Sequence, residues 1–484
     1  MQAILDGRAA VGAIDRVARM LPPGRKRAKA VRAQRLPPGP VMHPSAQLAL
    51  WMLQPIAFLT HCRAKYGTTF TMQLPGFNPI VSFADEAANK EVFTGPAEEM
   101  YAGRANESLR PVVGGGSLLL LDGERHLRER RLLLPPFHGA RMVSYGETIR
   151  DITRKELARA MLDRPEGIQP VMQHITLDVI LRTVFGVSEG ADLVALRGAI
   201  LHLLDGASPL NMIPALQIDL GGRSPWGRFL ERRTAVDALL YRVIASRRSE
   251  GTDGHDDILS MMIDARYEDG SGMSDRDLRD ELMTLLAAGH ETSATALAWA
   301  FTCLAANPEA QASARDEVDR VLGGGAPDDA VTKLELPVID AVIKETMRIH
   351  PVVYAVGRVL QKPRTIGGVD MPAGHAAILS IYLTHHNPEL WPTPERFVPK
   401  RFLDAPTGRG NRVTPYTYFP FGGGVRRCIG MAFAMYEMRI VLAEALRVFR
   451  IEPLTKNAGE TPRAVRRTVT MAPSGGGVVT LRRR

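Results

Sequence analysis

The sequence predicts a mainly α protein with small β-sheets, an α+β arrangement, and three observations support this fold class. A helical pattern dominates the stretch from about Asp122 to Ala306. Short patterns typical of strands lie before and after that stretch. The composition, with 45% hydrophobic and 23% charged residues over a length of 484, is that of a folded globular chain and excludes a disordered or fibrous one.

The N-terminal segment differs from the rest of the chain in charge. Residues 25–35, RKRAKAVRAQR, carry six basic side chains and no acid. Together with the three arginines at 482–484 they contribute nine positive charges, which equals the net charge of +9. The remainder is balanced, so the sequence argues against a nucleic-acid-binding surface. Residues 9–21 fit either a short amphipathic helix that touches anionic lipid or a solvated extension. We therefore expect a basic extension over residues 1–36.

A proline-rich linker, Leu36-Pro37-Pro38-Gly39-Pro40, marks the start of the compact part, which we expect to be one domain over residues 37–484. The chain has no apolar run of about 18 residues without charge, which argues against a transmembrane helix. Three cysteines are too few for a disulfide framework in a chain of this length. We expect a reducing, cytoplasmic location, with peripheral membrane contact through the N-terminus left open.

The longest predicted helix starts at a capping signal. Ser274 and Asp277 form a variant of the capping box, and the helix they begin extends to about Asn307. At 1.5 Å per residue it is about 50 Å long, enough to cross the domain. The other predicted elements are a helix over 55–65, a hairpin of 68–74 with 79–83, a helix over 337–350, strand-like pieces over 376–383, a helix over 428–448 and a final hairpin over 466–482.

The sharpest local pattern is a glycine-rich loop that delivers a cysteine to the start of a helix. It reads Phe421-Gly422-Gly423-Gly424-Val425-Arg426-Arg427-Cys428-Ile429-Gly430. A helix N-terminus and the two arginines favour the thiolate of Cys428, and the glycines let the backbone approach a flat ligand. A thiolate held in this way suits metal ligation. The alternative, a buried structural thiol, is our interpretation of Cys62 and Cys303, which lie on apolar helix faces.

This loop resembles the haem-binding loop of the cytochrome P450 family, F-x-x-G-x-R-x-C-x-G, and Phe421, Gly424, Arg426, Cys428 and Gly430 match every specified position. The resemblance implies the cytochrome P450 fold, with a long central helix over the haem, and haem b (iron protoporphyrin IX) as cofactor. It implies that Cys428 is the axial thiolate ligand of the iron. Phe421 would then pack near the sulfur, Arg426 would bind a haem propionate, and Gly430 would keep helix and porphyrin close.

A second motif is Glu345-Thr346-Met347-Arg348, the E-x-x-R of the family, whose spacing puts both charges on one helix face. Pro394-Glu395-Arg396-Phe397 supplies the family's second arginine. The resemblance therefore implies a buried charge cluster of Glu345, Arg348 and Arg396 behind the haem. An exposed helical ion pair is the alternative, and the presence of a partner arginine argues against it.

The long helix carries a third motif, Ala288-Gly289-His290-Glu291-Thr292, within an otherwise apolar run. By resemblance it lies over the distal face of the haem, where Ala288 and Gly289 leave room for dioxygen and Glu291 with Thr292 relays protons. A Thr that bends the helix by bonding its own backbone is an alternative compatible with the relay. A zinc H-E-x-x-H site is excluded, because the second histidine position is Ala294.

Candidate propionate ligands come from two further places. His126 and Arg130 are four residues apart and share a helix face, matching the segment where the family places H-x-x-x-R against the propionates. A solvated basic face is the alternative there. Arg358 lies where the family often supplies another propionate ligand. The resemblance also implies substrate walls from residues 98–120, 201–226, 285–288, 352–356 and the vicinity of Ser474.

Together, the motifs cover about residues 37–484 as one catalytic domain and resemble the soluble, bacterial type of the family. They imply a haem-thiolate monooxygenase that inserts one atom of O2 into a hydrophobic small molecule such as a lipid, fatty acid, terpenoid or steroid. No flavin or iron–sulfur segment is evident, so we expect electrons from a ferredoxin or flavodoxin with an NAD(P)H-dependent reductase. A peroxide-dependent hydroxylase, a haem isomerase and a non-catalytic haem-binding protein remain alternatives.

Overall fold

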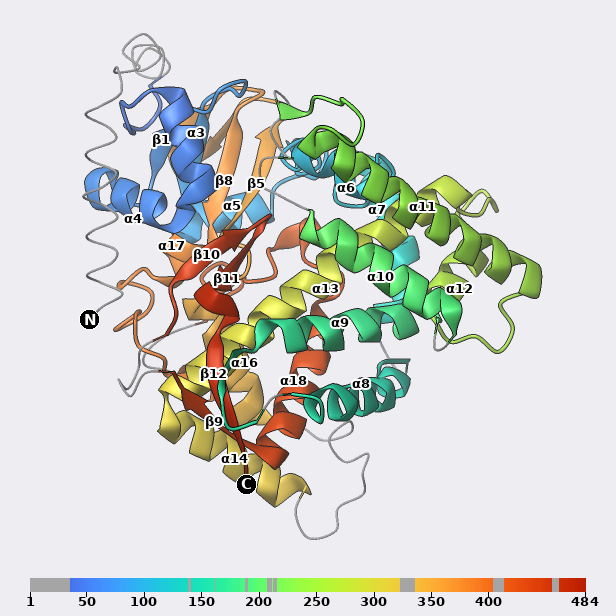
Figure 1. The fold of residues 1–484 in the computed structure, drawn as a ribbon. Coiled ribbons are helices and arrows are strands. Elements are labelled where there is room, and N and C mark those ends of the chain that lie inside the picture. Colours follow the sequence, from blue (N-terminus) through green and yellow to red (C-terminus); the bar gives the residue numbers. More distant parts are fainter. Residues whose placement is uncertain are drawn as a thin grey trace.

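The computed structural model describes residues 35–137, 141–160, 162–187, 190–206, 211, 216–322, 336–403, 413–454 and 461–484. The predicted basic extension, including the possible amphipathic helix over 9–21, lies outside these residues except for its last two. Figure 1 shows a sheet-containing part, built from the blue and orange segments, beside a larger helical part, with α13 passing through the middle.

The helices of the N-terminal half are α3 (Pro44–Leu53), α4 (Pro55–Tyr66), α5 (Glu86–Phe93), α6 (Arg110–Val113), α7 (Gly123–Leu133), α8 (Arg141–Leu157), α9 (Gln169–Thr183) and α10 (Ala191–Asp205). Those that follow are α11 (Pro225–Glu250), α12 (Ile258–Asp264), α13 (Asp275–Ala306), α14 (Pro308–Leu322), α16 (Pro337–Ile349), α17 (Ile381–His385) and α18 (Met431–Val448). The predicted helices over 55–65 and 337–350 are thereby confirmed.

One five-stranded sheet joins strands from residues 70–101 with strands from residues 355–380, in the order β1-β2-β8-β5-β3. Its strands are β1 (Phe70–Met72), β2 (Ile80–Phe83), β3 (Met100–Tyr101), β5 (Ala355–Leu360) and β8 (Ala376–Ser380). β1 and β2 form the predicted hairpin, and β2 pairs in parallel with β8. β6 (Arg364–Ile366) and β7 (Val369–Met371) form a separate hairpin.

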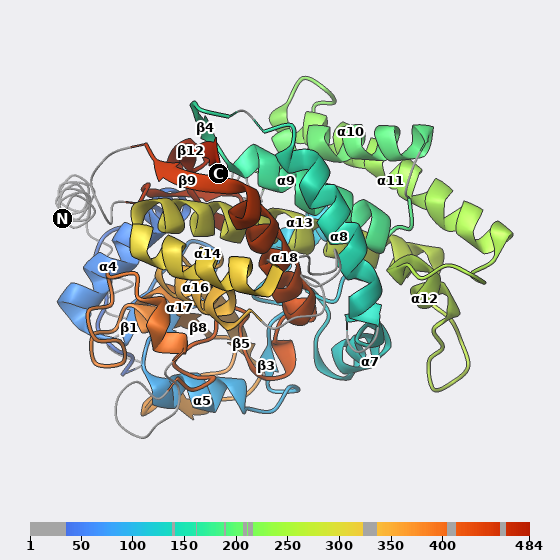
Figure 2. The ribbon, with the colours of Figure 1, turned by 90° about the horizontal axis from the view of Figure 1, so that it is seen from below.

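Helix α13 is the centre of the helical part. The Ser274 hydroxyl accepts a hydrogen bond of 3.1 Å from the Asp277 amide, so the predicted cap is present. The helix has 32 residues and packs against α9, α11, α16 and α18, with the largest apolar cluster around it. Figure 2 shows α18 running between α8 and α14, which it also contacts. The helix with the E-x-x-R motif and the helix after the cysteine loop are thereby held against α13.

The C-terminal strands differ from the predicted hairpin over 466–482, which is wrong in its pairing. The hairpin consists of β10 (Ala464–Arg467) and β11 (Thr470–Pro473). Gly475, Gly476 and Gly477 all have positive φ and turn the chain away, so that β12 (Val478–Arg483) pairs with β9 (Phe449–Pro453) and β4 (Pro165–Gly167) instead.

Candidate functional site

The glycine-rich loop holds Cys428 just before α18. A short 3-10 turn over Gly424–Arg426 precedes it, and the Cys428 amide donates a hydrogen bond of 2.9 Å to the Phe421 carbonyl. Gly424 has a φ of +62°, and a Cβ there would lie 2.1 Å from the Phe93 carbonyl oxygen. Only glycine fits this turn, because a side chain would be strained and would collide with backbone. The helix begins at Met431, three residues later than predicted.

The thiol of Cys428 is accessible, whereas Cys62 and Cys303 are buried. Burial of the surrounding loop raises the pKa of Cys428, while a hydrogen bond from the Gly430 backbone and the charges of Arg130 and Arg427 lower it. Burial raises the pKa of Cys62 to about 12. The pKa of Cys428 is raised overall, but the Gly430 hydrogen bond and the two arginines favour its thiolate, whereas at Cys303 burial also raises the pKa.

Four basic side chains predicted to share a site do gather near one another. Burial and the charges of Arg426, Arg130 and Arg358 lower the pKa of His126 to about 3. Burial and Arg426 lower the pKa of Arg358 to about 10. Burial also lowers the pKa of Arg426 to about 10, with Asp122 opposing and Arg130 adding to the effect.

This basic cluster, the neutral His126 with Arg130, Arg358 and Arg426, has fewer acids than arginines. Arg426 pairs with Asp122 and donates a hydrogen bond of 3.2 Å to the Leu118 carbonyl. The Arg358 guanidinium bonds only to backbone carbonyls among the described residues. Like charges that are buried or partly buried are unfavourable without counter-ions, so the three arginines fit a ligand that brings carboxylates.

The middle of α13 has a face that does not pack against protein. Ala288 is exposed, and Leu285, Ala287 and Thr292 are partly exposed, although the helix on both sides of them is buried. At Gly430, a Cβ would meet no atom within 4 Å. An accessible thiol, open space at Gly430 and an open apolar helix face together fit a flat ligand with a metal.

Glu291 points from α13 toward α9. Its carboxylate accepts hydrogen bonds of 2.7 Å from the Gln173 amide and 3.2 Å from the Gln169 amide. The Thr295 hydroxyl lies at 3.5 Å, and the Arg467 guanidinium, half exposed, at 3.9 Å. The acid is thus held by two neutral donors, with a surface arginine beside it.

The other residues of the α13 motif make separate contacts. The Thr292 hydroxyl donates to the Ala288 carbonyl, as the helix-bending alternative expects. It makes no bond to Glu291 in the structure. The His290 ring lies 2.9 Å from the Thr176 hydroxyl, and burial lowers its pKa to about 4. A Cβ on Gly289 would lie 2.9 Å from Ile180, so helix packing against α9 accounts for this glycine.

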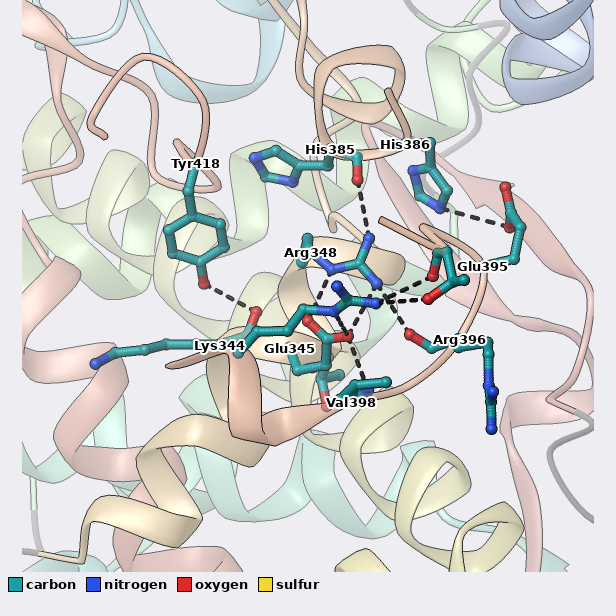
Figure 3. Close-up of polar contacts among 12 residues, drawn as sticks. Lys344, Glu345, Arg348, His385, His386, Glu395, Arg396, Val398 and Tyr418 are labelled. Carbon is teal, nitrogen blue, oxygen red and sulfur yellow. Dashed lines mark hydrogen bonds and ion pairs between the residues drawn. The ribbon is translucent and has the colours of Figure 1, made fainter. Parts of the chain in front are cut away.

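The buried charge cluster contains Glu345 and Arg348 but not the guanidinium of Arg396, which corrects that prediction. Arg348 donates hydrogen bonds of 2.7 and 2.9 Å to Glu345, and both side chains are fully buried. Arg396 contributes its backbone carbonyl to Arg348, while its side chain points away (Figure 3). The second arginine is Arg401, whose Nε lies 3.3 Å from Glu345.

A signal for Arg401 was present in the sequence. The pattern Pro-x-Arg-Phe occurs twice, at 394–397 and again at Pro399-Lys400-Arg401-Phe402. The Val398 amide donates a hydrogen bond of 2.9 Å to Glu345, which brings the second copy against α16. Gln169 and Gln173 had no comparable signal, because only the packing of α9 on α13 places them at Glu291.

The family model of cytochrome P450 matches residues 37–478. The chain belongs to the cytochrome P450 family. It is 40% identical over 449 residues to the putative cytochrome P450 135B1 of Mycobacterium tuberculosis, covering 92% of this chain and 91% of that protein. It is 38% identical to the putative cytochrome P450 138 of the same species, covering 87% and 90%.

Among solved structures, the fold resembles that of a retinoic acid-bound cyanobacterial protein, CYP120A1. The TM-score is 0.80 at 25% sequence identity, covering 93% of this chain and 99% of the other. As a cytochrome P450, the protein is a haem-dependent monooxygenase, an oxidoreductase. In the parts of the chain that the structure describes, no helix is long and apolar enough to cross a membrane.

Proposed function

We propose that this cytochrome P450 inserts one oxygen atom of O2 into a hydrophobic small molecule such as a lipid, fatty acid, terpenoid or steroid. The observation that carries the proposal is the accessible Cys428 thiol in a region that also gathers His126, Arg130, Arg358 and Arg426. A thiolate and a set of basic side chains are the two partners that a haem with its propionates requires.

Haem b, iron protoporphyrin IX, fits these residues. Cys428 would hold the iron through its sulfur, and the basic cluster would hold the two propionates. His126, kept neutral by its lowered pKa, would donate a hydrogen bond rather than a charge. Haem bound there would supply the redox chemistry that activates dioxygen.

Glu291 and Thr292 would deliver protons. Glu291 is 15% exposed and lies beside half-exposed Arg467, so it can exchange protons with solvent on the side of the β10–β11 hairpin. Delivery requires the carboxylate to leave Gln173 and the Thr292 hydroxyl to leave the Ala288 carbonyl, since neither side chain now reaches the other. The relay is therefore a rearrangement of two side chains on adjacent residues.

The open face of α13 supports an apolar substrate, because Leu285, Ala287 and Ala288 offer only aliphatic groups. The structural neighbour named as retinoic acid-bound supports the same class. We place the protein in the cytoplasm and assign electron supply to a ferredoxin or flavodoxin with its NAD(P)H-dependent reductase. Arg427 is exposed at the cysteine loop and can face an acidic partner, whereas Arg125 and Arg128 already lie within 3.6 and 3.4 Å of carboxylates.

Two measurements test the proposal. The dithionite-reduced holoprotein should bind carbon monoxide with the red-shifted Soret band of a thiolate-ligated haem, and Cys428→His should lose that band. Turnover should require a redox partner and NAD(P)H. Turnover with peroxide alone would identify a peroxide-dependent hydroxylase, and a spectrum like that of myoglobin would rule out the thiolate ligand.

A further inference from the structure

A polar cavity lies in a part of the molecule that includes no residue of the cysteine loop. It has a volume of about 230 Å³ and lies where the segment after α6 meets α11 and the first turns of α13. Its charged and hydroxyl-bearing lining residues are Arg233, Asp237, Tyr241, Arg276, Arg279 and Asp280. Asp280 and Ala288 are eight residues apart on α13, so the cavity lies roughly 12 Å along the helix from the open apolar face.

Both acids of this cavity are already paired with Arg279. Asp280 accepts hydrogen bonds of 2.7 Å from Arg279 and 2.7 Å from the Gly116 amide. Asp237 accepts a hydrogen bond of 2.8 Å from the Nε of Arg279 and another from its Nη2. Although burial opposes it, these bonds raise the pKa of Arg279. One buried arginine therefore bonds to two carboxylates, and the second oxygen of Asp237 faces the Nε of Arg233.

Two donors in the cavity remain unused. Arg276 is exposed, and no ion pair or hydrogen bond joins it to any residue that the structure describes. The Tyr241 hydroxyl, on a side chain 41% exposed, is equally without a partner among those residues. Arg233 is already partnered: its Nη1 donates to the Pro111 carbonyl at 2.9 Å, and its Nε lies 3.8 Å from the Asp237 carboxylate.

We propose that this cavity binds the anionic group, carboxylate or phosphate, of a ligand. Three arginines against two aspartates give a formal excess of one positive charge. Guanidinium and hydroxyl donors with no acceptor match a group that only accepts. A drug-sized ligand occupies roughly 300–1,000 Å³. The cavity, at about 230 Å³, therefore suits a head group. The group is either the head of an acidic substrate, which rests on the proposed function, or a free anion, which does not.

The first experiment uses inorganic phosphate. Isothermal titration of the holoprotein, with ionic strength held constant by chloride, should show binding. Arg276→Gln should weaken it roughly tenfold, because a charge-assisted hydrogen bond is lost, and Tyr241→Phe should weaken it less. Arg228→Gln is the matched control. Arg228 is exposed and lies on α11, the helix that carries Tyr241, and among the described residues its guanidinium bonds only to the Gly222 carbonyl, at 3.3 Å.

The second experiment uses dodecanoate and its methyl ester, followed through the Soret spectrum of the ferric holoprotein. If the cavity receives a substrate head group, Arg276→Gln weakens dodecanoate binding and leaves the ester unchanged. If it receives a free anion, the variant affects phosphate alone. The proposal is overturned if neither phosphate nor dodecanoate responds to Arg276→Gln and Tyr241→Phe.

Failure of the anion-site proposal can be distinguished from failure of the proposed function. A protein that keeps the thiolate-type carbon monoxide spectrum but shows no response in either titration lacks only the anion site. A protein that binds phosphate through Arg276 but lacks that spectrum has the anion site without the haem-thiolate chemistry. Circular dichroism of the two variants, whose side chains are both exposed, checks that they fold.

Discussion

Gln173 on α9 donates a hydrogen bond of 2.7 Å to the carboxylate of Glu291 on α13. The two residues are 118 positions apart in sequence, and α9 is the helix packed most extensively against α13. The position of the candidate proton donor is therefore set by a neighbouring helix as well as by its own motif.

Removal of this bond should disturb proton delivery. We expect Gln173→Leu to lower the yield of oxygenated product per NAD(P)H several-fold, because the carboxylate is no longer held in one place. Coupling efficiency with the redox partner is the measurement. Thr295→Val, which removes the 3.5 Å contact to Glu291 and the 3.3 Å bond from Gln169 but keeps the Gln173 bond, is the control and should have a smaller effect. Equal coupling efficiency in wild type and Gln173→Leu would show that the hydrogen bond from Gln173 to Glu291 has no role in the reaction.

The two arginines of the repeated Pro-x-Arg-Phe pattern should differ in their effect on folding. Arg401→Gln leaves the buried Glu345 carboxylate short of a partner and should lower the free energy of unfolding by about 3 kcal/mol. Arg396→Gln changes an exposed side chain and should stay within about 0.5 kcal/mol of wild type. Urea unfolding of both variants checks the assignment, and the reverse order of stabilities would restore Arg396 to the cluster.

Substitution of two glycines in the cysteine loop should have different effects, one on folding and one on haem binding. Gly424→Ala should prevent a stable fold of the loop, because its Cβ would lie 2.1 Å from the Phe93 oxygen at a φ of +62°. Gly430→Ala meets no protein atom within 4 Å and should leave the apoprotein as stable as wild type while reducing haem retention. The ratio of Soret to protein absorbance, with thermal unfolding of the apoprotein, separates the two effects. A Gly430→Ala protein with full haem retention would contradict the placement of the porphyrin there.

Stability should fall as the pH is lowered from about 6.5 toward 4. Burial lowers the pKa of His350 to about 3 and that of His386 to about 3, against 6.5 for the unfolded chain. Between these values the unfolded state binds more protons, so unfolding is favoured as pH falls, by up to about 1.4 kcal/mol per pH unit and histidine. His350→Asn should reduce the slope of unfolding free energy against pH. An unchanged slope would show that His350 does not contribute.

Features coded over short stretches of sequence were predictable. The cysteine loop, the Glu345–Arg348 pair and the Ser274 cap depend on residues within a few positions of one another, and the structure has each of them. Contacts between distant segments were not. The choice of Arg401 over Arg396 depends on how residues 392–402 cross α16, and nothing in the local pattern distinguishes the two copies. The final strand was mispaired for the same reason, since its partners β9 and β4 lie elsewhere in the chain.

The three-stranded sheet, in the order β4-β12-β9, places its most C-terminal strand in the centre. Gly167 in β4 finds its partner Val478 only 311 residues later, since 478 − 167 = 311. During synthesis on the ribosome, β4 and β9 therefore emerge without the strand that joins them. This sheet can form only after almost all of the described chain has been made, so its formation is a late step in folding. Shortening the C-terminus would remove its central strand and destabilise the sheet directly.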